Sequence, residues 1–256
     1  MKTLSRSLSV SGDGAPVTGF THAYLTGKES LSLLPSLFTL RLWNLSDSDY
    51  LLLSRCRSVT VTHDSAILAW GTLADCYRKL TKDGTVTELC ISPALPLWES
   101  TVSLSVEAGT TVSGTVRAIL AASGTGIFLL SFPGEDPAIS RPQAFYGRAS
   151  ECIMDVLSAV NARAYLVPAG LCVVPSSGLP VTLNLTDEDL LKEPSFAADS
   201  RMILQTSVSG WTVGKMASVT WPGGRAKGLI VSRAVDADNQ SGPWKTELLI
   251  EVSIRD

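Results

Sequence analysis

The chain has 256 residues, of which 45% are hydrophobic and 18% charged, and its formal net charge is −3. This length allows two or three compact units with a sizeable core, and the composition is that of a soluble protein. The missing basic stripe argues against a dedicated nucleic-acid-binding protein. No window approaches the roughly 18 continuous apolar residues of a membrane span, so stable membrane insertion is not expected.

The first segment, residues 1–36, is expected to be an N-terminal arm, either loose or holding one initial strand. Serine, glycine and threonine dominate its first 21 residues and supply little to bury. The basic start is not followed by an apolar stretch, so no secretory signal is expected. The five cysteines lack Cys-x-x-Cys spacing and are odd in number, which indicates free thiols in a reducing compartment.

A first β-barrel-like domain is expected over residues 37–132. A short helix should begin near Asp47, with Ser46 or Asp47 itself as its N-cap. A second helix is predicted over residues 113–123, because apolar residues recur there at helical spacing and Gly124 ends the pattern. Alternating apolar and polar residues bounded by turn residues predict the strands. These strands cover residues 37–43, 58–62, 72–74, 87–91, 101–106 and 127–132.

A small α/β insert is expected over residues 133–192. Residues 148–161 place apolar side chains on one helical face and predict the best helix of the chain. Two short strands, 164–167 and 171–174, should follow as a hairpin around Gly170. The insert begins with a loop, residues 133–142, which is either an interface or a long connection. Its end contains a short acidic stretch, Asp187-Glu188-Asp189, that suits a helix start.

Elements of a second β-barrel-like domain are expected over residues 193–256. After a strand at 201–208, this domain repeats the order of the stretch 58–91: an alternating run, a turn, a run opened by glycine, a turn and a final run. The final runs, residues 87–91 and 246–250, agree at four of five positions. Either the chain is internally duplicated or two meanders look alike by chance. The expected fold is mainly β (α+β), with two related meander domains flanking a helix-hairpin unit.

Catalytic, cofactor and metal sites are not expected. His63 and Asp64 are adjacent, but neighbouring residues in a tight turn point in different directions, and no Gly-x-Ser-x-Gly motif accompanies them. Glu151 and Asp155 suit the solvated face of a helix better than a catalytic pair. Residues 210–215 are one position short of a phosphate-binding loop. Clustered histidines or cysteines that could hold a metal are also missing.

The order of elements, together with short motifs, resembles the baseplate hub proteins, or late-control proteins, of contractile-tailed bacteriophages. The last of these motifs is similar to the Gly-x-Trp-x-Thr segment that closes the final β-domain of that family. The resemblance covers residues from about 38 to 252. The motifs are Gly214-Lys215-Met216-Ala217-Ser218-Val219, Lys227-Gly228-Leu229-Ile230-Val231 and Ser241-Gly242-Pro243-Trp244-Lys245-Thr246-Glu247-Leu248.

The resemblance implies a structural virion protein that is made in the host cytoplasm and incorporated in the tail baseplate. Two related domains per chain would give a homotrimeric ring pseudo-sixfold symmetry. Such a ring would join a hexameric tail tube to a trimeric central spike and let DNA pass as cargo during genome ejection. Other baseplate proteins and the tape measure protein are further expected partners. The candidate turn or interface residues are Gly71, Gly228, Trp244 and Thr246.

A second interpretation is a β-rich accessory protein of a phage particle that binds a receptor or glycan. Six tryptophans could form the stacking platform that such binding requires. They are scattered along the chain, and several lie within or beside predicted strands, where core or interface burial is the competing explanation. A tail-borne cell-wall hydrolase is a third possibility, and it would need a pocket that gathers titratable groups.

Overall fold

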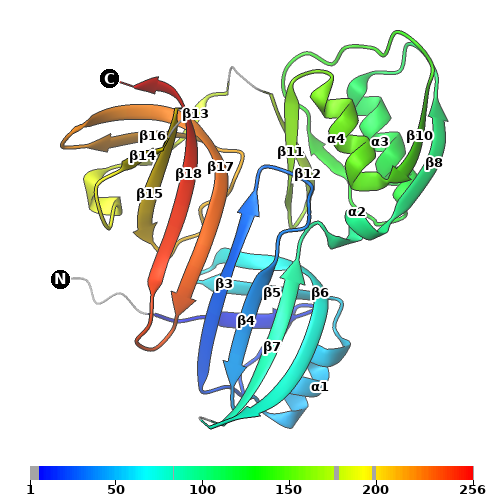
Figure 1. Cartoon of the computed structure of the whole chain (residues 1–256). Helices are drawn as coiled ribbons and strands as arrows, with labels where there is room; N and C mark the ends of the chain where they lie inside the picture. The colour runs from blue at the N-terminus through cyan, green and yellow to red at the C-terminus, as the bar shows by residue number, and fades with distance from the viewer. Residues whose placement is uncertain (1–5, 83, 176–178, 198–199, 256) are drawn as a thin grey trace. The chain divides into compact units, whose positions relative to one another are not determined.

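The computed structural model describes residues 6–82, 84–175, 179–197 and 200–255. It divides the chain into two compact units (Figure 1). Among the described residues, no helix is both long and apolar enough to cross a membrane. Unit 1 combines Met1–Ser30, Ser36–Ser92 and Val181–Asp256, and unit 2 combines Leu31–Pro35 and Pro93–Pro180.

Unit 1 is built on one large, mostly antiparallel sheet, with one α-helix and one short 3-10 helix among its described residues. Along the main path the strand order is β14-β15-β18-β17-β3-β4-β7-β6-β5-β1-β2, with β16 paired to β17 and β13 paired in parallel to β16. The elements are β1 (Ser9–Gly12), β2 (Ala15–Val17), β3 (His22–Ser30), β4 (Phe38–Trp43), α1 (Asp47–Arg55), β5 (Ser58–His63), β6 (Ala66–Thr81), β7 (Gly84–Ser92), β13 (Val181–Leu185), η1 (Asp187–Asp189), β14 (Ser195–Ala197), β15 (Arg201–Ser207), β16 (Met216–Trp221), β17 (Gly224–Asp238) and β18 (Trp244–Arg255).

Alternation of side chains determines which face of this sheet is buried. Phe38, Leu40 and Leu42 on β4 are fully buried, while the intervening residues lie on the opposite, more polar face. Helix α1 begins where the sequence predicts, because the side chain of Ser46 accepts a hydrogen bond from the backbone of Asp49. One face of the sheet therefore carries the core, and the other carries polar cross-strand contacts.

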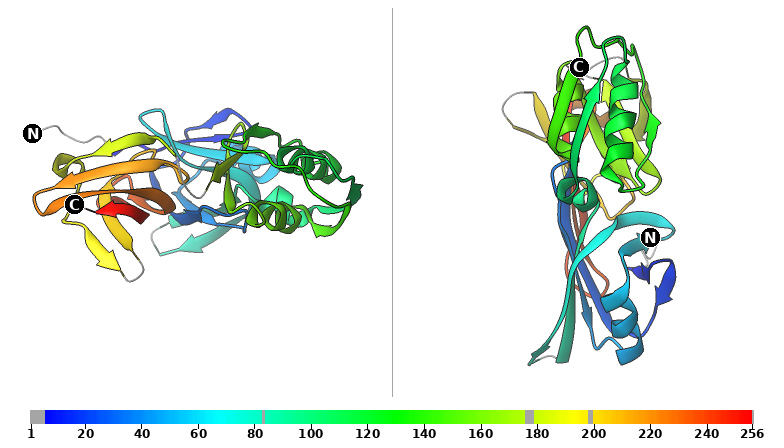
Figure 2. Two further views of the ribbon diagram at one scale, coloured as in Figure 1. Left: turned by 90° about the horizontal axis from the view of Figure 1, so that it is seen from above. Right: turned by 90° about the vertical axis from the view of Figure 1, so that its right-hand side faces the viewer.

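Unit 2 packs helices against two small sheets (Figure 2). Strands β8 and β10 form one antiparallel pair, and β11, β12 and β9 form a three-stranded sheet in which β9 runs parallel to β12. Its apolar core is shared by α3 and α4. The elements are α2 (Leu95–Glu99), β8 (Thr101–Val106), α3 (Val112–Ser123), β9 (Leu129–Ser131), β10 (Gln143–Arg148), α4 (Ala149–Ser158), β11 (Ala162–Val167) and β12 (Gly170–Pro175).

The structure divides the chain differently from the sequence analysis. Residues 93–132, expected in the first β domain, belong to unit 2, because β8 pairs with β10 and α3 packs on α4. The second β domain gains residues 181–192. The expected N-terminal arm contains three strands, and β3 lies between β4 and β17 in the middle of the large sheet.

Two smaller differences have local causes. Helix α2, which was not predicted from the sequence, has Pro96 in its first turn, where a proline lacks only an N–H that would have no intrahelical partner. The loop 133–142 is held against the start of α3. Asp136 accepts hydrogen bonds from the backbone N–H and the hydroxyl of Ser113, at 2.8 and 2.6 Å.

Candidate functional site: a joint between two equivalent halves

The two meanders of unit 1 have matching strand register. We define the first half as β3 to β7 and the second half as β14 to β18. In the first half Val59 lies opposite Gly71, and in the second half Ala217 lies opposite Gly228. The ladder that follows has a shift after Leu73 in one half and after Ile230 in the other. Both shifts lie opposite the similar runs 87–91 and 246–250, so the halves share this irregularity, although each also has one shift of its own, after Val61 and after Lys227.

The polar face of the sheet repeats a side-chain pair as well. Arg41 donates from Nε to Glu88 at 2.7 Å, and Gln205 donates from Nε2 to Glu247 at 3.0 Å. Each pair joins the final strand of a half to its neighbour, at directly opposed positions. These matching pairs support internal duplication over the chance alternative.

Glu88 is the more strongly held of the two glutamates. It accepts a hydrogen bond from the hydroxyl of Tyr77, and Lys79 lies 3.3 Å from Oε2. The Tyr77 bond and the contacts with Arg41 and Lys79 outweigh burial and lower the pKa of Glu88 to about 2. This carboxylate therefore ties β4, β6 and β7 together in its ionised form.

A direct ladder joins the two halves. Residues 232–238 of β17 pair in antiparallel register with residues 24–30 of β3. The other edge of β17 pairs with β18 along the same stretch, so β17 is a shared strand at the boundary. The halves therefore form one continuous sheet, as Figure 1 shows for β18, β17, β3 and β4.

Arg233 is a buried cation on the core side of this joint, only 2% exposed. Its Nη1 donates to the carbonyl oxygen of Trp211 and its Nη2 to that of Leu68, both at 2.8 Å, and Nη2 lies 3.3 Å from Oε2 of Glu29. The guanidinium lies over the Phe38 ring. Burial lowers the pKa of Arg233, and Glu29 opposes that effect. Its bonds connect β17 to β3, β6 and the segment before β16.

Trp244 contributes the apolar part of the joint. It is the first residue of β18 but belongs to the core cluster that also contains β4, β5 and β7 side chains. Its ring meets His63 edge-on, with centroids 4.9 Å apart, and it is 8% exposed. Among the described residues its Nε1 has no hydrogen-bond partner. The side chain therefore acts through packing between the halves.

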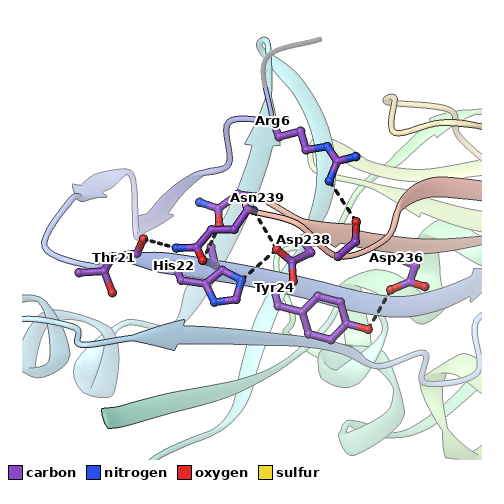
Figure 3. A network of polar contacts seen from close by, with 10 residues as sticks. Arg6, Thr21, His22, Tyr24, Asp236, Asp238 and Asn239 are labelled. Carbon is purple, nitrogen blue, oxygen red and sulfur yellow. Dashed lines mark hydrogen bonds and ion pairs between the residues drawn. The ribbon is translucent and has the colours of Figure 1, made fainter. Parts of the chain in front are cut away.

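A polar network closes the joint on the other face (Figure 3). His22 stacks on Trp43 and lies 3.0 Å from Asp238, while the hydroxyl of Tyr24 donates to Asp236 at 2.8 Å. Burial alone would raise the pKa of Asp238, but hydrogen bonds from the backbone N–H of Gln240 and from the side chain of His22 outweigh that effect, so this pKa is lowered. The tip of the β17–β18 hairpin is thereby held on β3.

The structure places the predicted turn or interface residues inside strands. Gly71, in β6, has φ 144, a region that favours glycine. A Cβ on Gly228 would lie 2.4 Å from the carbonyl oxygen of Glu251, so β17 and β18 need a glycine there to approach. Thr246 is fully buried opposite Thr206 of β15. Arg233 was not singled out from the sequence, because nothing local marks an arginine as buried.

The groups that were weighed as catalytic do not converge. His63 lies 3.4 Å from Asp64, but its Nδ1 faces the carbonyl oxygen of Ser7 and its ring packs on Trp244. Glu151 pairs with Arg148 on the surface of α4. Within the described ranges, no group of three histidine, cysteine or acidic residues could hold a metal. The five cysteines are all free, and Cys152 is buried.

The six tryptophans, all of them described residues, are buried or half-buried. Trp98 packs under Arg148 at 4.0 Å, and Trp211 donates to Thr206 at 2.9 Å. Trp221 contacts Phe196. None of the six forms an open platform for stacking a sugar.

This architecture occurs in several solved structures. A tail protein from Neisseria meningitidis superposes with a TM-score of 0.74 at 14% identity, covering 96% of each chain. The 43 kDa tail protein of prophage MuSo2 from Shewanella oneidensis gives a TM-score of 0.68 at 10% identity, again covering 96% of each. An Escherichia coli component of the type VI secretion system, similar to phage T4 tail proteins gp27 and gp5, gives 0.70 at 12%, covering 96% of this chain and 77% of that one.

The chain has the phage tail-protein fold. No protein-family model matches its sequence, and no curated protein does either. The tail-protein fold therefore rests on the arrangement of the elements, with identities of 14% or lower in these three structures. Both units take part in the match, since it extends over nearly the whole chain.

Proposed function

We propose that this chain is a structural baseplate hub protein of a phage tail. Three copies form a ring with pseudo-sixfold symmetry, which joins the hexameric tail tube to the trimeric central spike. The register match between the two halves of unit 1 carries this proposal. Two equivalent halves in each of three copies present six similar sheet segments, and this number suits a hexameric partner on one face of the ring.

The partners follow from the same symmetry. The face that repeats six times receives the tail tube protein, and the threefold features of the ring receive the spike, with other baseplate proteins and the tape measure protein as further neighbours. The likeness to a secretion-system component that resembles gp27 and gp5 supports a place beside a spike. The net charge of −3 suits a channel through which DNA passes without binding.

The alternative of glycan binding has less support, because all six tryptophans are buried or half-buried, and five of them contact other side chains of the protein. Residence in the virion follows from the hub role. Experiments on the purified protein can test the hub role directly, independently of the glycan-binding alternative.

The first test is the mass of the purified chain by light scattering, followed by negative-stain images. The proposal expects a species of three times the chain mass that appears as a ring with a central hole. A stable monomer at every concentration, which stays monomeric when tail proteins are added, would overturn it. Substitution of the exposed Glu107 to Gln, in unit 2 and outside both halves of unit 1, serves as a control that keeps the parent mass.

A further inference from the structure

The internal duplication gives a template for a contact between copies. The main path of the sheet contains two equivalent four-strand series, β14-β15-β18-β17 and β3-β4-β7-β6. In each series the similar five-residue run lies in the third strand, β18 or β7, and the last strand, β17 or β6, pairs with it. Strand β17 ends the first series and pairs with β3, the first strand of the second series. The equivalents of these two strands are β6 and β14.

The register makes this equivalence specific. Gly27 and Phe196 both lie opposite the first buried residue of the next strand, Phe38 in one half and Met202 in the other. On the other side, Ala234 and Tyr77 both lie opposite the repeated glutamate. Counting from these anchors, the intrachain pair Asp236 and Thr26 has Lys79 and Ser195 as its equivalents.

One edge of strand β6 lacks a neighbouring strand over residues 75–80 within the described chain. Residues 66–72 pair with β5, but residues 75–80 pair only with β7 within the described chain. Leu80 is 85% exposed, although its equivalent in the second half, Ala237, is fully buried at the joint. The edge of β6 at residues 75–80 can therefore accept a further strand.

Strand β14 is the complementary edge. It stands at one end of the strand order and all three of its residues are exposed. Figure 1 shows β14 and β6 on opposite sides of unit 1. The charges near the two edges also differ. Residues 75–82 contain three basic residues and one acidic one, although Arg78 pairs with Asp47 and Lys79 with Glu88 inside the chain, whereas residues 186–194 contain four acidic residues and one lysine.

We propose that β6 of one copy pairs with β14 of a second copy, in the register of β17 with β3. Tyr77, Arg78 and Lys79 then lie opposite Ala197, Phe196 and Ser195 of the neighbour. The two surfaces differ, so the contact is head-to-tail and can close into a ring. This interface rests on the proposed hub function for its closure after three copies, but its register comes from the intrachain joint.

A covalent test uses two equivalent cysteine pairs. Lys79→Cys with Ser195→Cys tests the contact between copies, and Thr26→Cys with Asp236→Cys tests the matching contact inside one chain. After mild oxidation, the first pair is expected to give linked dimers and trimers on a non-reducing gel, while the second stays at the monomer position. The parent protein, with its five native cysteines, controls for unrelated disulfides.

A second test removes the exposed apolar residue. Leu80→Lys is expected to weaken association about tenfold or more, with unchanged thermal stability of the monomer because Leu80 is exposed there. Leu51→Lys, at a 50% exposed position on α1, is the matched control. A ring without cross-linking between positions 79 and 195 overturns this interface and leaves the hub function standing. A monomer at every concentration overturns both.

Discussion

Replacing Trp244 with alanine tests whether the two halves are held together by a shared core. The side chain is 8% exposed, lies in the main core of unit 1 and contacts the ring of His63. Truncation of a buried tryptophan to alanine costs about 3–5 kcal/mol. For a chain of this size, 1 kcal/mol corresponds to about 2–4 °C in melting temperature. We therefore expect Trp244→Ala to lower the melting temperature of unit 1 by about 6–20 °C.

Trp244→Phe is the matched control. Because the indole Nε1 has no hydrogen-bond partner among the described residues, phenylalanine loses only apolar contact. We expect a smaller cost than for alanine, because fewer buried atoms are removed and a smaller cavity is left. Thermal unfolding followed by near-ultraviolet circular dichroism measures both variants, and light scattering at 20 °C reports assembly. If alanine costs no more than phenylalanine, Trp244 does not join the halves and the account of the joint is refuted.

Three further changes probe the same unit. Arg233→Met leaves two buried carbonyl oxygens and one carboxylate without their donor, so we expect the free energy of unfolding to fall by about 3–5 kcal/mol in chemical denaturation. Arg225→Met, at an exposed position on β17, is the control and should change it little. Gly228→Ala places a Cβ 2.4 Å from the carbonyl oxygen of Glu251 and should cost about 1–3 kcal/mol in the same assay. Glu88→Gln should make stability less dependent on pH in acid. Because folding lowers the pKa of Glu88 to about 2, this carboxylate stabilises the parent fully above pH 4.5, and that stabilisation is lost as the pH falls toward 2.

Each of these expectations has a result that contradicts it. An Arg233→Met variant as stable as Arg225→Met would mean that the guanidinium is not needed at the joint. A Gly228→Ala protein with parent stability would mean that β17 and β18 can separate without cost. Equal loss of stability in the parent and Glu88→Gln between pH 4.5 and 2 would remove Glu88 from the acid response.

Local sequence signals predicted the elements with the most regular patterns. The predicted strand over residues 101–106 matches β8, and the helix predicted over residues 113–123 matches α3 within one residue. Ser46, one of the two residues predicted as the N-cap, caps α1. These succeed because alternation, helical spacing and capping act over a few neighbouring residues. The common order of the two meanders was visible for the same reason.

Distant pairing explains what the sequence analysis missed. Strand β3 falls in the segment that was assigned to the N-terminal arm, yet it pairs with β4 on one side and β17 on the other. The boundary of unit 2 was misplaced because β8 finds its partner in β10, well beyond α3. Neither pairing leaves a local signal, since backbone hydrogen bonds do not depend on residue type.

The sequence by itself determined the mainly β class, the repeated meander and most of the helices, because side-chain periodicity and turn chemistry are local properties. Tertiary structure alone decided that the two repeats share one sheet, that Trp244 packs in the core of the opposite half, and that Arg233 is buried. An arginine is normally exposed, and it can be buried here because Glu29 and the carbonyl oxygens of Leu68 and Trp211, distant along the chain, converge on its guanidinium.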